Sequence, residues 1–135
     1  MMKSMPDVSV LIVDDDEVAA EILQKFTTFS FPDARIEWSW DGFQALLVIE
    51  EVNPDIILLD YMMPKIDGMV FLEKMRALMP KQDARIIVVT AYADAKLEKE
   101  FLDRGVDMVL SKPITYDNIK PLFDSIKQKL IAEAN

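Results

Sequence analysis

Four apolar runs in this sequence are each followed by residues that can bind a metal ion or a phosphate group. The runs cover residues 8–13, 56–59, 86–89 and 108–110, and the residues after them are Asp14 and Asp15, Asp60, Thr90, and Ser111 with Lys112. If these residues meet, the carboxylates repel one another and need a compensating cation. Mg²⁺ suits the set because it binds one or two carboxylates and keeps several waters. Lys112 offers a second positive charge.

The same residue types can accept a phosphoryl group. A bound Mg²⁺ with an open position binds one phosphoryl oxygen, Thr90 can donate a hydrogen bond to a second oxygen, and Lys112 can hold a third. A carboxylate placed in line with the leaving group would be the nucleophile, and the product would be an aspartyl phosphate. The combination predicts a Mg²⁺-dependent phosphoryl-acceptor site.

Each of these residues also has an ordinary structural interpretation. An Asp after a strand is usually a turn residue or a helix N-cap, and Asp16 is expected to cap the helix that follows the first run. Thr90 alone would be a strand-end residue, and Lys112 alone would be a solvated one. The functional hypothesis depends on a coincidence, because four chain positions carry the required chemistry in one order.

The apolar runs are short and mostly β-branched, which predicts strands buried on both faces. A weaker run from Ala34 to Trp40 alternates Ile36, Trp38 and Trp40 with polar residues, and it predicts a half-covered strand. Segments of helical period separate the strands, so we expect an α/β protein with a parallel sheet. If the strand order is 2-1-3-4-5, ligands bind between the carboxyl ends of the first and third strands, where the aspartates lie.

Stripes of apolar residues predict the buried faces of five helices. The stripes are Val18, Ile22, Leu23 and Phe26; Phe43, Leu46, Leu47 and 50–52; Phe71, Leu72, Met75 and Leu78; Leu97, Phe101 and Leu102; and Ile119, Leu122, Phe123, Ile126, Leu130 and Ile131. Pro121 conflicts with a last helix that begins at Tyr116, because a proline past the first turn removes a backbone hydrogen bond. We expect that helix to begin late, with Asn118 as N-cap, or to have a frayed first turn.

Composition excludes several classes of function. The chain has 135 residues, a formal net charge of −9, no histidine and no cysteine. It therefore has no disulfide framework, no thiol nucleophile, no histidine-ligated zinc and no Ser-His-Asp triad. The acidic balance argues against direct binding of nucleic acid, and no apolar stretch approaches the roughly 18 residues of a membrane span. Met1 to Pro6 is too short and polar for a secretory signal, so a cytoplasmic protein is expected.

Taken in order, the motifs of this chain resemble the receiver domain of two-component response regulators over nearly its whole length. The matching segments are 10–16 (VLIVDDD), 41–46 (DGFQAL), 54–64 (PDIILLDYMMP), Asp67-Gly68, 88–91 (VVTA) and 111–113 (SKP). Each segment alone is unspecific, but their order and spacing together are highly specific. The resemblance implies a flavodoxin-like (βα)5 fold, a doubly wound parallel sheet of strand order 2-1-3-4-5, and one receiver domain over residues 1–135.

The resemblance also implies a role for each residue of the site. Asp60 would be the phosphoacceptor, and Asp14 and Asp15 would form the acidic pair that holds Mg²⁺. Asp15 and Asp60 would be direct ligands, together with the backbone carbonyl of Met62. The phosphoryl oxygens would contact Thr90 as well as the lysine of the SKP motif.

Three structural details also follow from the resemblance. Lys112 would be that lysine, and its peptide bond to Pro113 would be cis, which is plausible only before a proline. Gly68 would permit the turn into the third helix. Ala91 would keep the site uncrowded.

One position departs from the family pattern. Receiver domains often have Tyr or Phe three residues before the lysine, with a ring that turns inward on phosphorylation, and this chain has Val109 there. Met62 and Tyr92 flank the site instead, at positions that tune in the family how fast water attacks the phosphoryl group. We hypothesise that both side chains partly shield a phosphoaspartate, and the alternative is that they simply pack at the surface.

The resemblance implies a phosphorylation-dependent signalling switch rather than a classical enzyme. Asp60 would take its phosphoryl group, with Mg²⁺, from a sensor histidine kinase or a histidine phosphotransfer protein, and the chain would catalyse its own phosphorylation and dephosphorylation. The fourth helix, fifth strand and fifth helix would form an output face that binds a downstream protein or a second copy of the chain. We expect a stand-alone receiver, because no output domain follows the fifth helix.

Two alternatives remain open on the sequence. The chain could be a non-phosphorylated scaffold or interaction module, and Val109 leaves some room for that reading. It could also be a Mg²⁺-dependent phosphohydrolase with an aspartyl-phosphate intermediate. Such enzymes typically need a second Asp two residues after the nucleophile, where this chain has Met62.

Overall fold

Five strands alternate with five helices along the chain. The structure is a computed structural model that describes residues 7–134, so the prediction for Met1 to Pro6 lies outside it. The elements are β1 (Ser9–Val13), α1 (Glu17–Ser30), β2 (Arg35–Ser39), α2 (Gly42–Val52), β3 (Ile56–Leu59), α3 (Gly68–Leu78), β4 (Arg85–Thr90), α4 (Ala95–Asp103), β5 (Met108–Ser111) and α5 (Tyr116–Ala134). None of the helices within residues 7–134 combines the length and apolar character needed to cross a bilayer.

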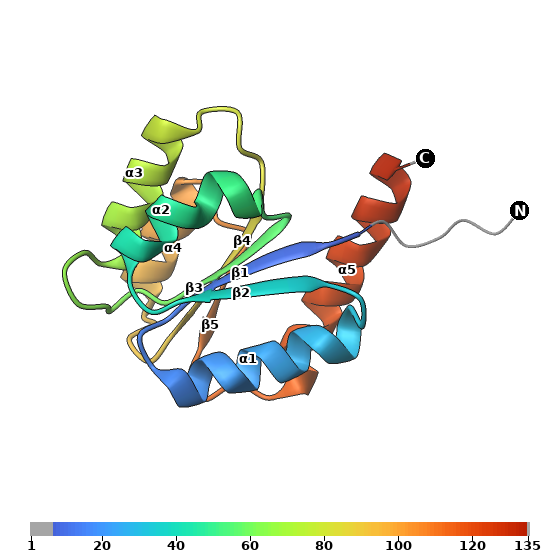
Figure 1. Cartoon of the computed structure of the whole chain (residues 1–135). Coiled ribbons are helices and arrows are strands. Elements are labelled where there is room, and N and C mark those ends of the chain that lie inside the picture. The colour runs from blue at the N-terminus through green and yellow to red at the C-terminus, as the bar shows by residue number, and fades with distance from the viewer. Residues whose placement is uncertain (1–6, 135) are drawn as a thin grey trace, which may run out of the picture.

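The strands form one parallel sheet in the order β2-β1-β3-β4-β5. This order confirms the predicted doubly wound architecture. Figure 1 shows α1 and α5 on one face of the sheet and α2, α3 and α4 on the other. The direction of winding reverses at β1, so the carboxyl ends of β1 and β3 lie side by side. In doubly wound sheets, ligands bind at this point.

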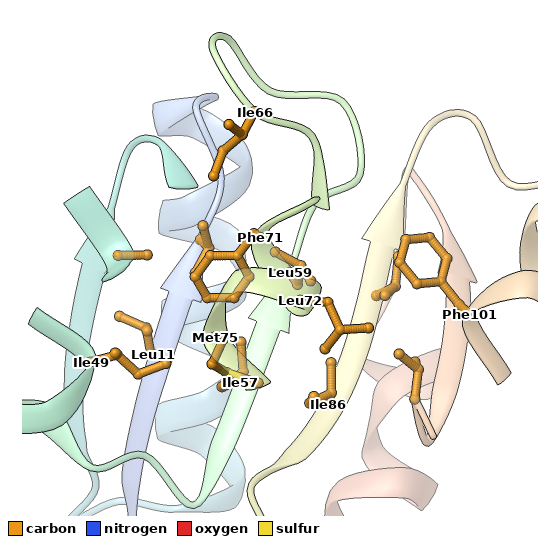
Figure 2. Packing of buried hydrophobic residues seen from close by; sticks show 14 of the residues in the cluster. Leu11, Ile49, Ile57, Leu59, Ile66, Phe71, Leu72, Met75, Ile86 and Phe101 are labelled. Atoms are coloured by element: carbon orange, nitrogen blue, oxygen red, sulfur yellow. The ribbon is translucent and has the colours of Figure 1, made fainter. Parts of the chain in front are cut away.

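Each face of the sheet has its own apolar core, because successive side chains of a strand point to opposite faces. In β1, Leu11 and Val13 pack in the core under α2, α3 and α4, whereas Val10 and Ile12 pack in the core under α1 and α5. Figure 2 shows the first of these cores, where Phe71 from α3 lies over the central strands. The central strands β1, β3 and β4 are thus almost entirely buried, as predicted, and form a rigid base for the residues that follow them. The predicted burial of residues 108–110 is wrong, because β5 lies at the edge of the sheet and its residues are exposed or half-buried.

The predicted helix stripes are wider than the buried helix faces. In α2, Ala45, Ile49 and Val52 are buried, whereas Leu47 is 84% exposed. Leu47 lies two residues from Ala45 and so points to nearly the opposite side of the helix. Other stripe residues found exposed are Val18, Ile22, Phe43, Leu78 and Leu102. Apolar residues that face solvent share the helical spacing, so periodicity locates the helix but not the width of its buried face.

The edge strand β2 follows the predicted alternation only at its start. Ile36 packs in the core under α1 and α5, as expected. Trp38 and Trp40 are exposed, whereas Ser39 between them is buried, so the expected inward orientation of the two indoles is wrong. The two rings pack edge to face with their centroids 6.3 Å apart.

The last helix begins earlier than predicted. It starts at Tyr116 and contains Pro121 in its interior, so the expected late start is wrong. The reason is a reciprocal cap: the Thr115 N–H donates to Asn118 Oδ1 at 3.2 Å, and the Asn118 N–H donates to Thr115 Oγ1 at 3.3 Å. The carbonyl that Pro121 cannot bond belongs to Asp117, an exposed residue, so water can solvate it.

Helices α1 to α4 each begin with an aspartate N-cap. The caps are Asp16, Asp41, Asp67 and Asp94, and each carboxylate accepts a hydrogen bond from the first turn. The predicted capping role of Asp16 is therefore confirmed. Because these helices follow the carboxyl ends of the strands, their N-termini, which carry positive partial charge, lie toward the edge of the sheet that holds the aspartates.

Two glycines that follow such caps test how closely α3 approaches the site. A Cβ on Gly68 would lie 2.5 Å from the backbone oxygen of Asp60, whereas a Cβ on Gly42 would lie 2.6 Å from Cγ1 of the Ile66 side chain. We expect Gly68→Ala to lower the free energy of unfolding by about 1–3 kcal/mol, because backbone must shift. Gly42→Ala should lower the free energy of unfolding by less, because the Ile66 side chain can move. Both residues begin a helix, so propensity effects cancel in a urea-unfolding comparison, and an equal or smaller loss in Gly68→Ala would contradict the argument.

Candidate functional site

The backbone ladder of the sheet continues one residue past three of the strands and fixes the predicted site residues. The Asp14 N–H donates to the last carbonyl of β2 at 3.1 Å, and the Asp60 N–H donates to the last carbonyl of β1 at 2.9 Å. The Lys112 N–H likewise donates to the last carbonyl of β4 at 2.9 Å. The three side chains therefore leave the sheet from backbone positions that are as constrained as the strands themselves.

These side chains converge at the carboxyl edge of the sheet. One oxygen from each of Asp14, Asp15 and Asp60 lies within 4.8 Å of the others. Asp14 is 1% exposed and Asp60 is 6% exposed, while Asp15 faces solvent. Lys112 Nζ lies 2.8 Å from Asp14 Oδ2 and 3.2 Å from Asp60 Oδ2. The structure thus brings together residues that follow three different strands.

Burial and charge oppose each other in this cluster. Burial raises the pKa of Asp14, and its contacts with Lys112 and with the Asp16 N–H offset that rise only in part. Burial acts to lower the pKa of Lys112, but Asp14 and Asp60 outweigh it and raise this pKa above its ordinary value. Lys112 is therefore a fixed cation at neutral pH, and within residues 7–134 its ammonium is the one that pairs with the acidic cluster.

The acidic pocket could bind a divalent cation. Oδ2 of Asp14 is buried and, among the residues that the structure describes, accepts no hydrogen bond. The Lys112 ammonium lies 2.8 Å from this oxygen as its ion-pair partner. Clustered carboxylate oxygens with unused acceptor capacity are the donors that Mg²⁺ prefers. The pocket of Asp14, Asp15 and Asp60 therefore fits this ion.

Thr90 and Pro113 lie at or just after the ends of β4 and β5. Thr90 is the last residue of β4 and is fully buried. Its Oγ1 accepts a hydrogen bond from the Tyr92 N–H at 3.2 Å, so the hydroxyl is tied to the loop between β4 and α4. The Lys112–Pro113 peptide bond is cis, as the resemblance implies.

The loop between β3 and α3 holds Met62, whose carbonyl is expected to be a metal ligand. Met62 lies two residues after Asp60, and the residue is 47% exposed. Gly68 closes the loop, because its N–H donates to the Tyr61 carbonyl at 2.6 Å. Val109 is half-buried against the core under α2, α3 and α4. Valine has no aromatic ring that could turn toward the site.

Sequence analysis missed two contacts beside the site. The Trp38 indole N–H donates to the backbone carbonyl of Asp14 at 2.7 Å. Lys65 Nζ lies 3.2 Å from Asp41 Oδ2 and so joins the loop after β3 to the start of α2. Neither contact has a sequence signal, because each joins residues from different segments and spacing reports only on positions within one element.

A pocket of about 330 Å³ opens beside Lys112, between α1 and the segment after β5. Its lining is mostly apolar and includes Val18 and Ile22 from α1 and Pro113 and Ile114 from the segment after β5. The pocket therefore gives the polar site an apolar border on the side of α1.

Comparison with protein families gives one clear match. The family model described as the response regulator receiver domain matches residues 10–124. The probable C4-dicarboxylate response regulator DctR of Halalkalibacterium halodurans is 34% identical over 119 residues, which cover 88% of this chain and 51% of that protein. The chain spans about half the length of the curated relatives it matches.

Solved structures share the fold. The signal receiver domain of a putative LuxO repressor protein from Vibrio parahaemolyticus has a TM-score of 0.83 at 23% identity, with 95% of each chain covered. A chain from the CheX–CheY–BeF3–Mg²⁺ complex of Borrelia burgdorferi has a TM-score of 0.77 at 28% identity, with 87% of each chain covered.

The raised pKa of Asp14 predicts how stability depends on pH. In the folded chain Asp14 keeps its proton at pH values where the unfolded chain has lost it, so its contribution to stability is present below about pH 3.8 and falls as pH rises through the folded pKa. Without divalent cations, we expect Asp14→Asn to raise the free energy of unfolding at pH 7, and this advantage should shrink toward pH 4. Urea unfolding across this pH range measures the effect.

The matched control for this measurement is Asp33→Asn. Asp33 is an exposed carboxylate before β2, at the opposite end of the strand from the site. Its substitution should change stability by no more than about 0.5 kcal/mol at any of these pH values. A loss of stability in Asp14→Asn at pH 7 would show that the buried carboxylate contributes more through its contacts than it costs through burial.

Proposed function

The chain belongs to the response regulator receiver domain family, and from this premise we propose that it is a phosphorylation-dependent switch with Asp60 as phosphoacceptor. Receiver domains are signalling domains of two-component systems and not classical enzymes. The observation that carries the proposal is the position of Lys112 Nζ, which contacts both Asp14 and Asp60 although the three residues follow different strands. This arrangement places a cation where a phosphoryl group on Asp60 would add negative charge.

The proposed reaction moves a phosphoryl group onto a carboxylate. An oxygen of Asp60 attacks phosphorus and forms an O–P bond while the bond between phosphorus and the donor breaks. The electron pair of that bond leaves with the donor, either the imidazole nitrogen of a phosphohistidine or the carboxylate oxygen of acetyl phosphate. The chain has no histidine of its own, so a phosphohistidine would belong to a partner. Attack by water on phosphorus later restores the carboxylate.

The residues of the site would divide this work. Asp15, Asp60 and the Met62 carbonyl would hold Mg²⁺, with Asp14 beside them. When bound, Mg²⁺ neutralises charge on the phosphoryl oxygens. Lys112 would hold a second phosphoryl oxygen, and the acidic residues keep its ammonium charged. The chain would in this way catalyse both the gain and the loss of its own phosphoryl group.

Thr90 is the proposed link from the phosphoryl group to the rest of the fold. Its hydroxyl accepts the Tyr92 N–H and keeps its own proton free to donate to a phosphoryl oxygen. If Thr90 turns toward that oxygen, the Tyr92 N–H either follows or loses its acceptor. In both cases the loop that precedes α4 changes, and α4, β5 and α5 would form the output face.

The partners follow from the family and from the surface. Response regulator receiver domains interact with histidine kinases or histidine phosphotransfer proteins, and we expect one of these to donate the phosphoryl group here. Such a donor must reach Asp60 from outside the sheet edge, so it would cover the apolar pocket formed by Val18, Ile22 and Pro113 beside the site. A downstream protein or a second copy of the chain would bind the output face, where Leu102 and Met108 are exposed.

A non-phosphorylated scaffold is the main alternative function. A purely structural role would not need a buried ammonium held between Asp14 and Asp60, because taking such charged groups out of water is costly. A phosphohydrolase is less well supported, because the residue two positions after Asp60 is Met62, which cannot act as a general acid or base.

Phosphorylation of Asp60 is directly testable with a small phosphodonor. With acetyl phosphate and Mg²⁺, the intact mass of the protein should rise by one phosphoryl group, and a chelator of divalent cations should prevent the rise. Asp60→Asn should abolish it, whereas Asp33→Asn, at the far end of the sheet, should not. Unchanged mass in the wild type under these conditions would favour the scaffold.

The lifetime of the phosphoaspartate tests the proposed shielding by Met62 and Tyr92. Met62 and Tyr92 are 47% and 60% exposed as residues, so any shielding is partial, and we expect Met62→Ala and Tyr92→Ala each to speed hydrolysis of the phosphoaspartate by only a few-fold. The decay of the phosphorylated form after removal of donor gives the rate. Leu78→Ala removes an equally exposed apolar side chain from α3 and should leave the lifetime unchanged. Equal lifetimes in all variants would mean that both residues only pack at the surface.

A further inference from the structure

The loop between β3 and α3 is fixed at both ends but must also be held in its middle. At its start, the Asp60 N–H bonds the last carbonyl of β1, and at its end, the Gly68 N–H bonds the Tyr61 carbonyl. The Met62 carbonyl lies between these anchors, and the proposed function requires it to face the metal. The residues that hold residues 62–67 in place therefore decide whether this ligand is available.

The middle of the loop contains a strained turn. The Ile66 N–H donates to the Pro64 carbonyl at 2.9 Å, which closes a three-residue turn around Lys65. Lys65 has φ of 73°, a value typical of the γ-turn that is rare because it is strained. Non-glycine residues in such conformations persist only where the surroundings over-determine them, and they cluster at functional sites.

Two contacts with the start of α2 hold this turn. Lys65 Nζ lies 3.2 Å from Asp41 Oδ2, and the Asp41 side chain is only 8% exposed. The other oxygen of Asp41 accepts the Gln44 N–H at 2.7 Å as the N-cap of α2. Next to Lys65, the buried Ile66 lies so close to Gly42 that a Cβ there would be 2.6 Å from Ile66 Cγ1. One contact is ionic and one is steric, and both join the loop to the same turn of helix.

We propose that Lys65 and Asp41 form a clasp that positions the Met62 carbonyl for the metal, so that both are positioning residues for phosphorylation. The inference rests on the proposed function, because it concerns the same Mg²⁺ site. The clasp stabilises the positive φ of Lys65, and it fixes the backbone three residues after Met62. Neither side chain touches the acidic cluster in the contacts described, so its effect on the metal passes through the backbone.

The clasp should affect metal affinity more than stability. Lys65 is 60% exposed along its side chain, and ion pairs with an exposed partner contribute little to folding. A metal ligand displaced by a fraction of an ångström, however, weakens binding markedly, because Mg²⁺ demands near-ideal octahedral geometry. Loss of the clasp should therefore appear in the Mg²⁺ dissociation constant and hardly at all in cation-free stability.

The test compares two substitutions that change net charge in opposite directions. Lys65→Gln removes a positive charge and Asp41→Asn removes a negative one, while asparagine keeps the N-cap. The Mg²⁺ dissociation constant is read from the rise of the unfolding midpoint with Mg²⁺ concentration. If only the electrostatic field of the two charges mattered, Lys65→Gln would bind Mg²⁺ more tightly and Asp41→Asn less tightly. A clasp predicts that both bind it more weakly.

We expect each variant to raise the Mg²⁺ dissociation constant by about threefold to tenfold. Removing a group that hydrogen-bonds to a metal ligand typically lowers metal affinity by about 10-fold to 100-fold, so the expected effect lies at or below the lower end of that range. The double variant should be no weaker than either single one, because both break the same pair. Lys65→Arg should retain most of the affinity. Lys81→Gln, an exposed lysine in the loop after α3, controls for net charge and should not weaken binding.

The outcomes separate this inference from the proposed function. If the unfolding midpoint of the wild type does not rise with Mg²⁺ concentration, the proposed metal site is contradicted, and the proposed clasp is contradicted with it. If the wild type binds Mg²⁺ but Lys65→Gln binds it equally or more tightly, only the clasp is overturned. Additive losses in the double variant would also overturn it, because they would show that Lys65 and Asp41 act separately.

Discussion

Electrostatic repulsion at one edge of the sheet is the constraint on which the rest of the structure depends. Three carboxylates lie within 4.8 Å of one another, and a single ammonium contacts two of them. A flexible scaffold would relieve this repulsion by moving the side chains apart. The sheet prevents that, because its backbone ladder continues through Asp14, Asp60 and Lys112, and the buried central strands β1, β3 and β4 hold the ladder. A cation bound among these carboxylates would relieve the repulsion.

The loops around the site follow from the same constraint. Gly68 is needed because α3 begins against the backbone of Asp60, where a Cβ would meet the carbonyl oxygen. Helices α1 to α4 follow the carboxyl ends of strands, so their aspartate-capped N-termini lie toward the sheet edge that carries the acidic cluster. The strained turn at Lys65 fits this pattern, since backbone strain is tolerated where neighbouring elements leave the chain no other course.

The sequence predicted the site better than it predicted the surfaces of the helices. Strand ends could be located because apolar runs end abruptly, and parallel strands bring their carboxyl ends to one edge, so Asp14, Asp60 and Lys112 were predicted to meet. Helix faces were predicted too wide, as Leu47 shows, because exposed apolar residues share the helical period. The start of α5 was missed because a reciprocal cap outweighed the cost of Pro121. The pair of Lys65 and Asp41 had no local signal at all, because it depends on how two loops meet.

A valine at position 109 does not isolate the site from α4. Tyr61, directly after Asp60, lies edge-on to the buried ring of Phe101 in α4, with centroids 5.8 Å apart. Thr90 bonds the loop that precedes the same helix. An aromatic pair contributes about 0.5–1.5 kcal/mol to stability and a hydrogen bond about 1 kcal/mol, and each contributes to coupling between two sites only by the amount that its strength differs between two states of the fold. Two contacts therefore already join residues next to the acidic cluster to α4 and to the loop before it, and neither contact requires a ring at position 109.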